Sequence, residues 1–309
     1  MLSEAMLACA GVINRMGSIA AGSTVSDYHE SEQHRQISVS TTLMHMEWQS
    51  KKFNILDCPG YVDFISEAMG ALRVSDLAVV TVHANHGVGI GTETVWKCAI
   101  ANGIPKVIVV NAFDKEETSF DKTLAQLRER FGERVFPLVV PVNAGPGFNQ
   151  VLDVMRSEVI TYATDKSGKF TEAPATGALA EQAKQLHNQL IEYIAESDDA
   201  LMEKFFAQGG LSEEEVRASL HSAIQKQVFV PVFCTAAESN IGVARLMDFI
   251  AKYGSSPVDR PKVEAVDADG NQVEVVLTNS DPVLYVFKTM SEAQFGELSF
   301  FRVYSGSVK

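Results

Sequence analysis

The residues most able to do chemistry form the run Asp57-Cys58-Pro59-Gly60, which follows the apolar stretch Phe53–Leu56. This order predicts a strand that ends on a carboxylate and then turns through Pro-Gly into a helix. An aspartate at the carboxyl end of a strand can hold a cation through water, and a glycine lets its backbone N–H approach a phosphate oxygen. Because Pro-Gly also marks ordinary turns, this run alone leaves a plain turn as an equal alternative.

A second polar run, Asn111-Ala112-Phe113-Asp114, follows the mostly apolar stretch Lys106–Val110. An aspartate in this place can accept hydrogen bonds from the N1–H and the exocyclic amine of guanine, while the asparagine braces the loop. Taken alone, Asn111 and Asp114 are more typical of a turn held by side-chain hydrogen bonds. Two such runs, separated by one strand and one helix, together favour a guanine-nucleotide site.

Strands and helices alternate around these two runs. Apolar stretches and helical spacing predict strands at Leu77–Val82 and Lys106–Val110 and helices at Phe64–Leu72 and Thr92–Asn102. This alternation is typical of a parallel, doubly wound α/β sheet, in which ligands lie beyond the carboxyl ends of the strands. Both polar runs fall at such ends.

The chain before Asp57 is predicted to hold a helix, a loop and a hairpin. Residues 1–11 are apolar, but Glu4 lies among them and no basic segment precedes it, so they indicate a helix that ends near Gly11 or Gly17 and not a signal peptide. Residues 22–36 are polar and lack periodicity, which predicts a surface loop. Residues 37–48 alternate like a half-exposed strand, and 49–52 turn the chain back into the strand that ends at Asp57.

The composition is that of an ordinary globular protein, with 309 residues of which 46% are hydrophobic and 21% charged, and it predicts two domains or more. A net charge of −13 argues against a broad surface that grips bare nucleic acid. No run reaches the roughly 20 apolar residues that a membrane span needs, so we expect a soluble protein. Neither a zinc site nor a disulfide framework is indicated, and reduced, cytoplasmic thiols are expected, because no C-x-x-C pair joins Cys9, Cys58, Cys98 and Cys234.

Taken together, these runs resemble the motifs of translational GTPases of the elongation factor G type. The run Asp57–Phe64 is similar to that family's second-switch motif, D-T-P-G-H-V-D-F, and His34–Ser38 resembles its first-switch motif, R-G-I-T. The run Asn111–Asp114 stands at the N-K-x-D guanine motif. The run Val232–Ala237, before Asn240-Ile241-Gly242-Val243, resembles the S-A motif, whose backbone reaches the base. The match extends from near residue 1 to the end of the chain.

The resemblance implies a GTPase that binds Mg²⁺ and GTP and acts on the ribosome in translation elongation. It implies Ser38 and Asp57 as metal ligands and Tyr61 as the catalytic residue, in the place of the histidine that positions the attacking water. The implied GTP-binding residues are Asp57, Cys58, Pro59, Gly60, Tyr61, Asn111, Ala112, Phe113, Asp114, Thr235 and Ala236. The implied partners are guanine nucleotide and the ribosome with its stalk protein, and the protein is expected to be a cytoplasmic monomer with no membrane contact.

The resemblance also implies a P-loop-NTPase-like doubly wound sheet whose first strand is missing, a mainly helical inserted subdomain called G′, and the start of a β-barrel. The predicted division is the first part of the G domain at 1–145, G′ at 146–227, the last part of the G domain at 228–256, a linker at 257–280 and the barrel at 281–309. Helices are expected at 179–195 and 212–227, where Ser212-Glu213-Glu214-Glu215 is a capping signal. Residues 283–308 alternate like barrel strands.

Three features depart from the family pattern. The phosphate loop G-x-x-x-x-G-K-[ST] is absent from these residues, and the Ser-Gly-Lys-Phe run at 167–170 lacks its spacing and is predicted to be an unrelated turn. We expect the first strand and its loop to lie upstream of Met1, which leaves a gap in the sheet between 53–56 and 77–82. Tyr61 replaces a histidine, and tyrosine is a poorer proton acceptor, so slow or differently gated hydrolysis is expected. Ala112 replaces the lysine whose stem covers guanine.

These departures leave a second interpretation open. Without the amides and lysine of the phosphate loop, the β- and γ-phosphates lose their main cradle, so this chain is expected to bind nucleotide poorly. The sequence therefore indicates a divergent paralogue of elongation factor G. The alternative is a non-hydrolysing pseudo-GTPase or a ribosome-binding module.

Overall fold

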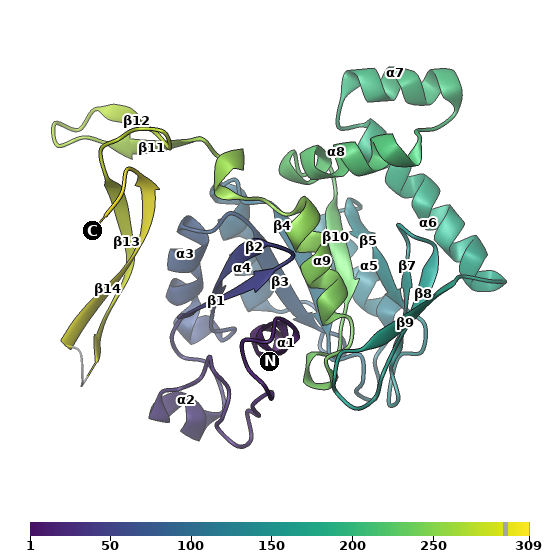
Figure 1. Ribbon diagram of the computed structural model, residues 1–309, viewed down its shortest axis with the longest axis horizontal. Helices are drawn as coiled ribbons and strands as arrows, with labels where there is room; N and C mark the ends of the chain where they lie inside the picture. The colour runs from purple at the N-terminus through teal and green to yellow at the C-terminus, as the bar shows by residue number, and fades with distance from the viewer. Residues whose placement is uncertain (293–295, 309) are drawn as a thin grey trace.

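A four-stranded parallel sheet runs through the middle of the computed structural model, which describes residues 1–292 and 296–308 (Figure 1). Its strands lie in the order β3 (Ala78–His83), β4 (Lys106–Asn111), β10 (Val230–Cys234) and β5 (Val135–Pro137). All three neighbouring pairs are parallel. The α/β class predicted from the sequence is confirmed.

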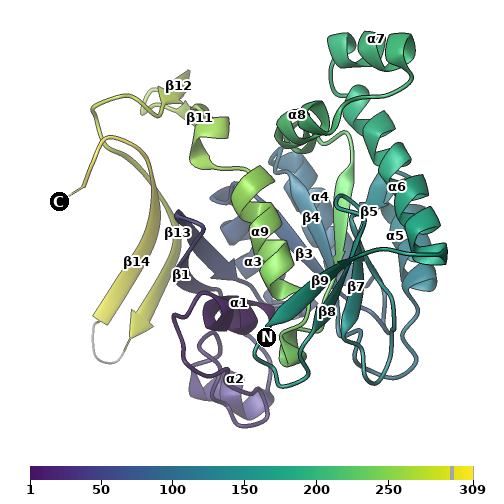
Figure 2. The same cartoon turned by 45° about the vertical axis from the view of Figure 1, so that its right-hand side comes forward.

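Helices cover both faces of this sheet, which is why its inner strands β4 and β10 are mostly apolar. Four consecutive residues of β4, 107–110, are fully buried, as expected for a parallel strand with helices on either side. Figures 1 and 2 show α1 (Leu2–Cys9) and α9 (Val243–Tyr253) on one face. The opposite face carries α3 (Ile65–Arg73), α4 (Ile90–Ala101) and α5 (Phe120–Phe131).

An antiparallel hairpin of β1 (Thr42–Trp48) and β2 (Lys51–Asp57) ends at Asp57. We call the turn that follows, Asp57–Gly60, the Asp57 corner. Among the described residues, β2 and β3 belong to different sheets, as the predicted gap between them requires. Two local expectations were wrong. The strand expected from residue 37 begins at Thr42, and the stretch expected as loop contains a short helix, α2 (Glu30–Arg35), which a capping box starts.

Helix α1 is held by a second, smaller apolar cluster, in which its Met6 and Leu7 pack with Met44 and Met46 of β1 and Met247 of α9. The helix ends just before Gly11, as predicted. Methionine fills irregular spaces well, which suits a helix that rests on a hairpin and on another helix at once. The cluster therefore fixes the beginning of the chain against the Asp57 corner.

The insertion holds more strand than the sequence predicted. Its helices are α6 (Ala178–Ala195), α7 (Asp199–Gln208) and α8 (Glu213–Gln225), and α6 and α8 match the two predicted helices. Beside them lies an antiparallel sheet of β7 (Gln150–Asp153), β8 (Glu158–Tyr162) and β9 (Phe170–Pro174), which we did not predict, and β6 (Val139–Pro141), just before the predicted insertion, is its fourth strand. Residues 167–169 lie in the turn between β8 and β9, as expected, and Phe170 begins β9.

The C-terminal part forms two hairpins, β11 (Lys262–Val266) with β12 (Gln272–Val276) and β13 (Val283–Glu292) with β14 (Gly296–Ser305). The stretch 257–280, predicted as a linker, therefore contains the first hairpin. The second lies in the predicted barrel segment, of which residues 293–295 and 309 are outside the described residues. It lies beside α3, where Arg302 of β14 pairs with Asp76 at 2.7 Å (Figure 1). No helix in the described part of the chain is both long and apolar enough to span a membrane.

Candidate guanine-nucleotide site

The register of the central sheet brings the predicted base-binding loops to one edge. His83 of β3 is paired with Asn111 of β4, and Val110 is paired with Cys234 of β10. The loops that begin at Asn111 and Thr235 therefore leave neighbouring strands at the same level. Parallel strands place their carboxyl ends together in this way, and ligands of such sheets lie at that edge.

Asn111 ties the two loops together. Its Oδ1 accepts hydrogen bonds from Thr235 Oγ1 at 3.0 Å and from the Ala237 N–H at 2.9 Å. The Phe113 N–H donates to the Thr235 carbonyl at 3.2 Å. The structure thus gives Asn111 the bracing contacts that its side chain was predicted to make.

Asp114 is held by residues that the sequence analysis did not single out. Its Oδ2 accepts from Ser239 Oγ at 2.8 Å, and the neighbouring Lys115 pairs with Glu238 at 2.8 Å. The hydrogen bond and charge of Glu238 raise the pKa of Lys115, and Lys115 in turn lowers the pKa of Glu238. The Ser239 hydrogen bond holds the Asp114 carboxylate, and the Lys115–Glu238 pair joins the two base loops beside it. The polar pair Glu238-Ser239, which directly follows the S-A-like run Val232–Ala237, was the signal available in the sequence.

The backbone around the base loops carries two unusual features. Ala112 has φ of 70°, a left-handed conformation that costs a non-glycine residue about 1–3 kcal/mol and is found at functional sites. The Ala236 N–H donates to the Ile241 carbonyl at 3.0 Å. A base contact through that amide therefore requires this bond to be shared or broken. Gly242 permits the tight return of the loop, because a Cβ there would lie 2.4 Å from the Cys234 carbonyl oxygen.

The Asp57 corner is joined to α1. Asp57 Oδ2 accepts from Ser3 Oγ at 2.6 Å. Next to it, the Thr41 hydroxyl lies 3.7 Å from Cys58 Sγ, and burial raises the pKa of the Cys58 thiol to about 11. A thiol with such a pKa is uncharged and unreactive near neutral pH, so its role at this corner is packing.

In the described part of the chain, the two predicted metal ligands, Ser38 and Asp57, are hydrogen-bonded to different residues and not to each other. The Ser38 hydroxyl donates to Asp27 Oδ1 at 2.7 Å, whereas Asp57 is bonded to Ser3. Within residues 1–292 and 296–308, no group of three or more His, Cys, Asp and Glu side chains is placed to hold a metal. The carboxylate oxygens of Asp57 still suit Mg²⁺ as ligands, because this ion keeps several waters and is usually bound through one or two carboxylates and the substrate phosphates.

Glu32 of α2 organises the loop that carries Ser38. This carboxylate is fully buried and accepts from three backbone N–H groups, those of His29 at 3.3 Å, Val39 at 2.9 Å and Ser40 at 3.0 Å. Glu4 of α1 does the same for the preceding segment, where it accepts from the N–H groups of Gly17 and Val25. Two buried carboxylates therefore hold the irregular parts of 17–40 that precede and follow α2.

We expect Glu32→Gln to loosen this loop by about 2 kcal/mol, because an amide offers one acceptor oxygen where the carboxylate offers two charged ones. The measurement is hydrogen exchange of the Val39 and Ser40 amides, which should speed up by more than tenfold. Glu30→Gln, an exposed change on the same helix, is the matched control. Equal exchange in the two variants would show that Glu32 does not hold the loop.

A third contact links the first-switch segment to the C-terminal hairpin. Glu67 of α3 accepts from the Thr41 N–H at 2.6 Å and pairs with Lys288 of β13 at 3.1 Å, while Lys288 also donates to the Thr41 carbonyl at 2.7 Å. Partial burial acts to raise the pKa of Glu67, but the bonds from Thr41 and Lys288 outweigh it and lower that pKa. The hairpin thus rests on both segments that flank the Asp57 corner.

Tyr61 faces solvent at this corner. It is 57% exposed, and it precedes a short 3₁₀ turn at Val62–Phe64. Gly60 is also exposed, with open space where a Cβ would be. The Tyr61 ring is therefore not packed in the protein interior, and its hydroxyl is accessible to water.

Comparison with known proteins agrees with this geometry. The family model for the elongation factor Tu GTP binding domain matches residues 1–256. The chain belongs to this family. It is 33% identical to elongation factor G of Mycoplasma pneumoniae over 310 residues, which cover 99% of this chain and 45% of that protein. A crystal structure from Thermus thermophilus matches 99% of this chain and 43% of its own, with a TM-score of 0.86 and 27% identity.

These matches confirm the resemblance to elongation factor G-like translational GTPases. The chain is an elongation factor G-like GTP-binding domain, and it spans a little under half the length of the relatives it matches. The site residues carried over from the family motifs remain predictions, now with the contacts described above.

Proposed function

We propose that this chain is the guanine-nucleotide-binding part of a factor that acts on the ribosome during translation elongation, and that the parent protein hydrolyses GTP. The observation that supports this most strongly is the braced pair of base loops, in which Asn111 joins the loops and Ser239 orients Asp114. A carboxylate fixed at the edge of a parallel sheet, with its second oxygen available, suits the two adjacent donors of guanine.

The other predicted residues have corresponding roles in this proposal. Asp57 would hold a magnesium-bound water, and Ser38 would reach the metal only after leaving Asp27. When bound, Mg²⁺ supplies charge neutralisation at the phosphates. Tyr61 would orient the attacking water through its exposed hydroxyl. The helical insertion would meet the ribosomal stalk protein, and the factor would act as a cytoplasmic monomer.

The alternative function is a ribosome-binding module that does not hydrolyse GTP. One observation favours it, namely the tyrosine at position 61, where the family motif has a histidine. Co-sedimentation with ribosomes separates the two functions. A GTPase factor should bind ribosomes only with a non-hydrolysable GTP analogue present, whereas a binding module should bind equally with and without it.

As it stands, this 309-residue chain should bind guanine nucleotides weakly and with little difference between GDP and GTP. The base loops are present, but the phosphate loop that distinguishes the γ-phosphate is not in the sequence. Titration with fluorescent GDP and GTP analogues, with and without Mg²⁺, is the measurement. Tight binding that depends on magnesium would contradict the expectation.

A further inference from the structure

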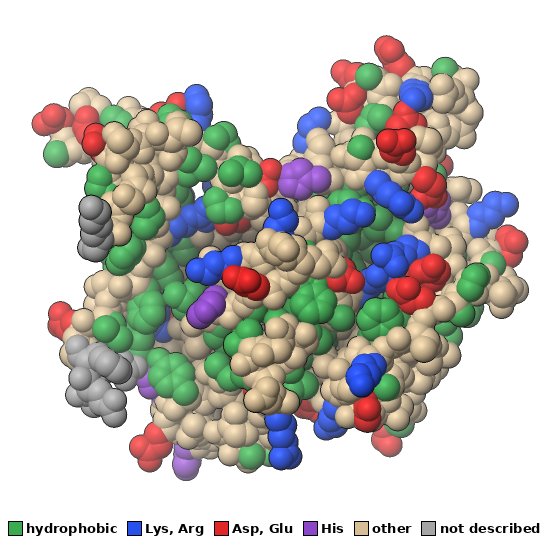
Figure 3. Space-filling view, in the orientation of Figure 1, with side chains coloured by type: hydrophobic (Ala, Val, Ile, Leu, Met, Phe, Trp, Pro, Cys, Tyr) green, Lys and Arg blue, Asp and Glu red, His purple; other side chains and the backbone are tan. Residues whose placement is uncertain are grey.

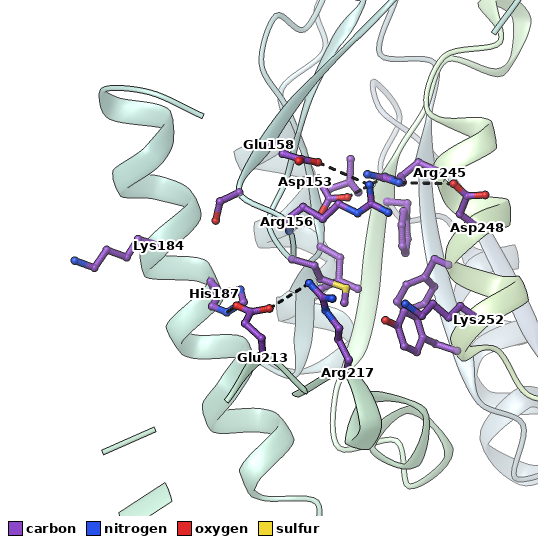
Figure 4. A pocket seen from close by; sticks show the side chains of 17 residues that line it. Asp153, Arg156, Glu158, Lys184, His187, Glu213, Arg217, Arg245, Asp248 and Lys252 are labelled. Carbon is purple, nitrogen blue, oxygen red and sulfur yellow. Dashed lines mark hydrogen bonds and ion pairs between the residues drawn. The ribbon is translucent and has the colours of Figure 1, made fainter. Parts of the chain in front are cut away.

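A cavity of about 560 Å³ lies between the insertion and α9. Its walls come from the turn between β7 and β8, from α6 and the start of α8, and from β10 and α9 (Figure 4). Small-molecule sites have about this volume. The described lining includes none of the predicted GTP-binding residues, so the cavity is separate from the nucleotide site.

The floor of the cavity is aromatic. Phe233 of β10 and Phe249 and Tyr253 of α9 are 2%, 6% and 7% exposed. The ring centroids of Phe233 and Phe249 are 4.9 Å apart, and those of Phe249 and Tyr253 are 5.4 Å apart. These rings are almost wholly buried against one another, so each presents a small apolar edge to the cavity, against which a flat ligand ring can pack.

The rim of the cavity is more basic than the protein as a whole. Five Lys and Arg side chains and four Asp and Glu side chains line it, although the whole chain has a net charge of −13. Figure 3 shows basic side chains gathered over this part of the molecule. Two of the acids are neutralised within the wall, because Arg245 Nε lies 2.9 Å from Asp153 and its Nη1 lies 3.6 Å from Asp248.

Two cations on different walls remain available. Lys252 of α9 has no ion-pair partner among the described residues, and its ammonium lies 5.2 Å from the Tyr253 ring centroid. Arg217 of α8 pairs with Glu213 at 3.6 Å, but these side chains are 57% and 61% exposed, so the pair is weak. Lys184 also lines the cavity, yet its ammonium points away from it (Figure 4).

We propose that this cavity binds a small aromatic anion, in which a flat ring system carries a phosphate or a carboxylate group. The ring packs on Phe249 and Tyr253, and the anion lies between Arg217 and Lys252. Guanidinium and ammonium groups on opposite walls suit an anionic group because each adds a charge-assisted hydrogen bond.

The test is calorimetric titration of the chain with four probes: AMP, 2-naphthoate, adenosine and inorganic phosphate. We expect AMP or 2-naphthoate to bind saturably with a Kd below about 1 mM, and the ring alone or the anion alone to bind at least tenfold more weakly. If AMP binds more tightly, the anionic group of the ligand is a phosphate, and if 2-naphthoate binds more tightly, it is a carboxylate. AMP is used because its base lacks the donor pair that the guanine site accepts.

Arg217→Met and Lys252→Met should each weaken binding about tenfold, and Lys184→Met should change it less than about twofold. Thermal unfolding without ligand checks that the exposed substitutions leave the fold intact. The proposal is overturned if neither aromatic anion binds, if adenosine binds as well as AMP, or if both variants bind normally.

Discussion

Asp114→Asn should reverse the base preference of the nucleotide site from guanine to xanthine. The change replaces one acceptor oxygen with an amide donor, which suits the carbonyl that xanthine has in place of the exocyclic amine of guanine. Hydrogen bonds to charged groups contribute about 1.5–3 kcal/mol, so the ratio of GTP to XTP affinity should fall by one to two orders of magnitude. The partner of Asp114, Ser239, keeps the new side chain in place because its hydroxyl can also donate to an amide oxygen.

The measurement needs nucleotide binding strong enough to compare. A chimera in which the first strand and phosphate loop of the M. pneumoniae elongation factor G precede Met1 provides it, with GTP and XTP competing against a fluorescent analogue. Ser239→Ala is the matched control, since it removes the supporting hydroxyl and keeps the carboxylate. It should weaken both nucleotides without favouring XTP. An unchanged ratio in Asp114→Asn would mean that Asp114 does not contact the base.

The central sheet and the base loops were predictable because their sequence signals are local. A strand covered on both faces must be apolar throughout, and residues 107–110 show this directly. The residues that follow each strand then lie at a known edge, which is where Asn111 was expected, and in the structure its side chain meets Thr235 there. Each of the runs Asp57–Gly60 and Asn111–Asp114, taken alone, could also be an ordinary turn. The order of the motifs along the chain favoured a single nucleotide site instead.

The parts that could not be predicted depend on contacts with distant residues. Strand β9 is exposed at every position, so it has no alternating pattern, and only its pairing with β8 makes it a strand. The polar segment 22–36 gave no periodic signal because buried Glu32, and not an apolar face, holds it. Ser239 looked like an ordinary polar loop residue until the fold placed it against Asp114.

Tyr61→His should raise the rate of GTP hydrolysis on the ribosome. Imidazole can both orient water and share charge with the transition state, whereas the tyrosine hydroxyl can only orient it. Acid–base positioning of this kind contributes about 10²–10⁴-fold at most. We expect a gain of about tenfold, since much of the barrier is lowered by phosphate and metal electrostatics that the substitution leaves unchanged.

Tyr61→Phe should lower the rate, because the ring is 57% exposed and so cannot act mainly by packing. The measurement is single-turnover hydrolysis at saturating GTP with ribosomes, in a chimera that also carries the later domains of the M. pneumoniae relative. Tyr285→Phe, at a tyrosine of β13 that is 42% exposed, is the control and should leave the rate unchanged. Equal rates for Tyr, Phe and His at position 61 would remove this residue from the chemistry, and the alternative of a binding module would then gain support.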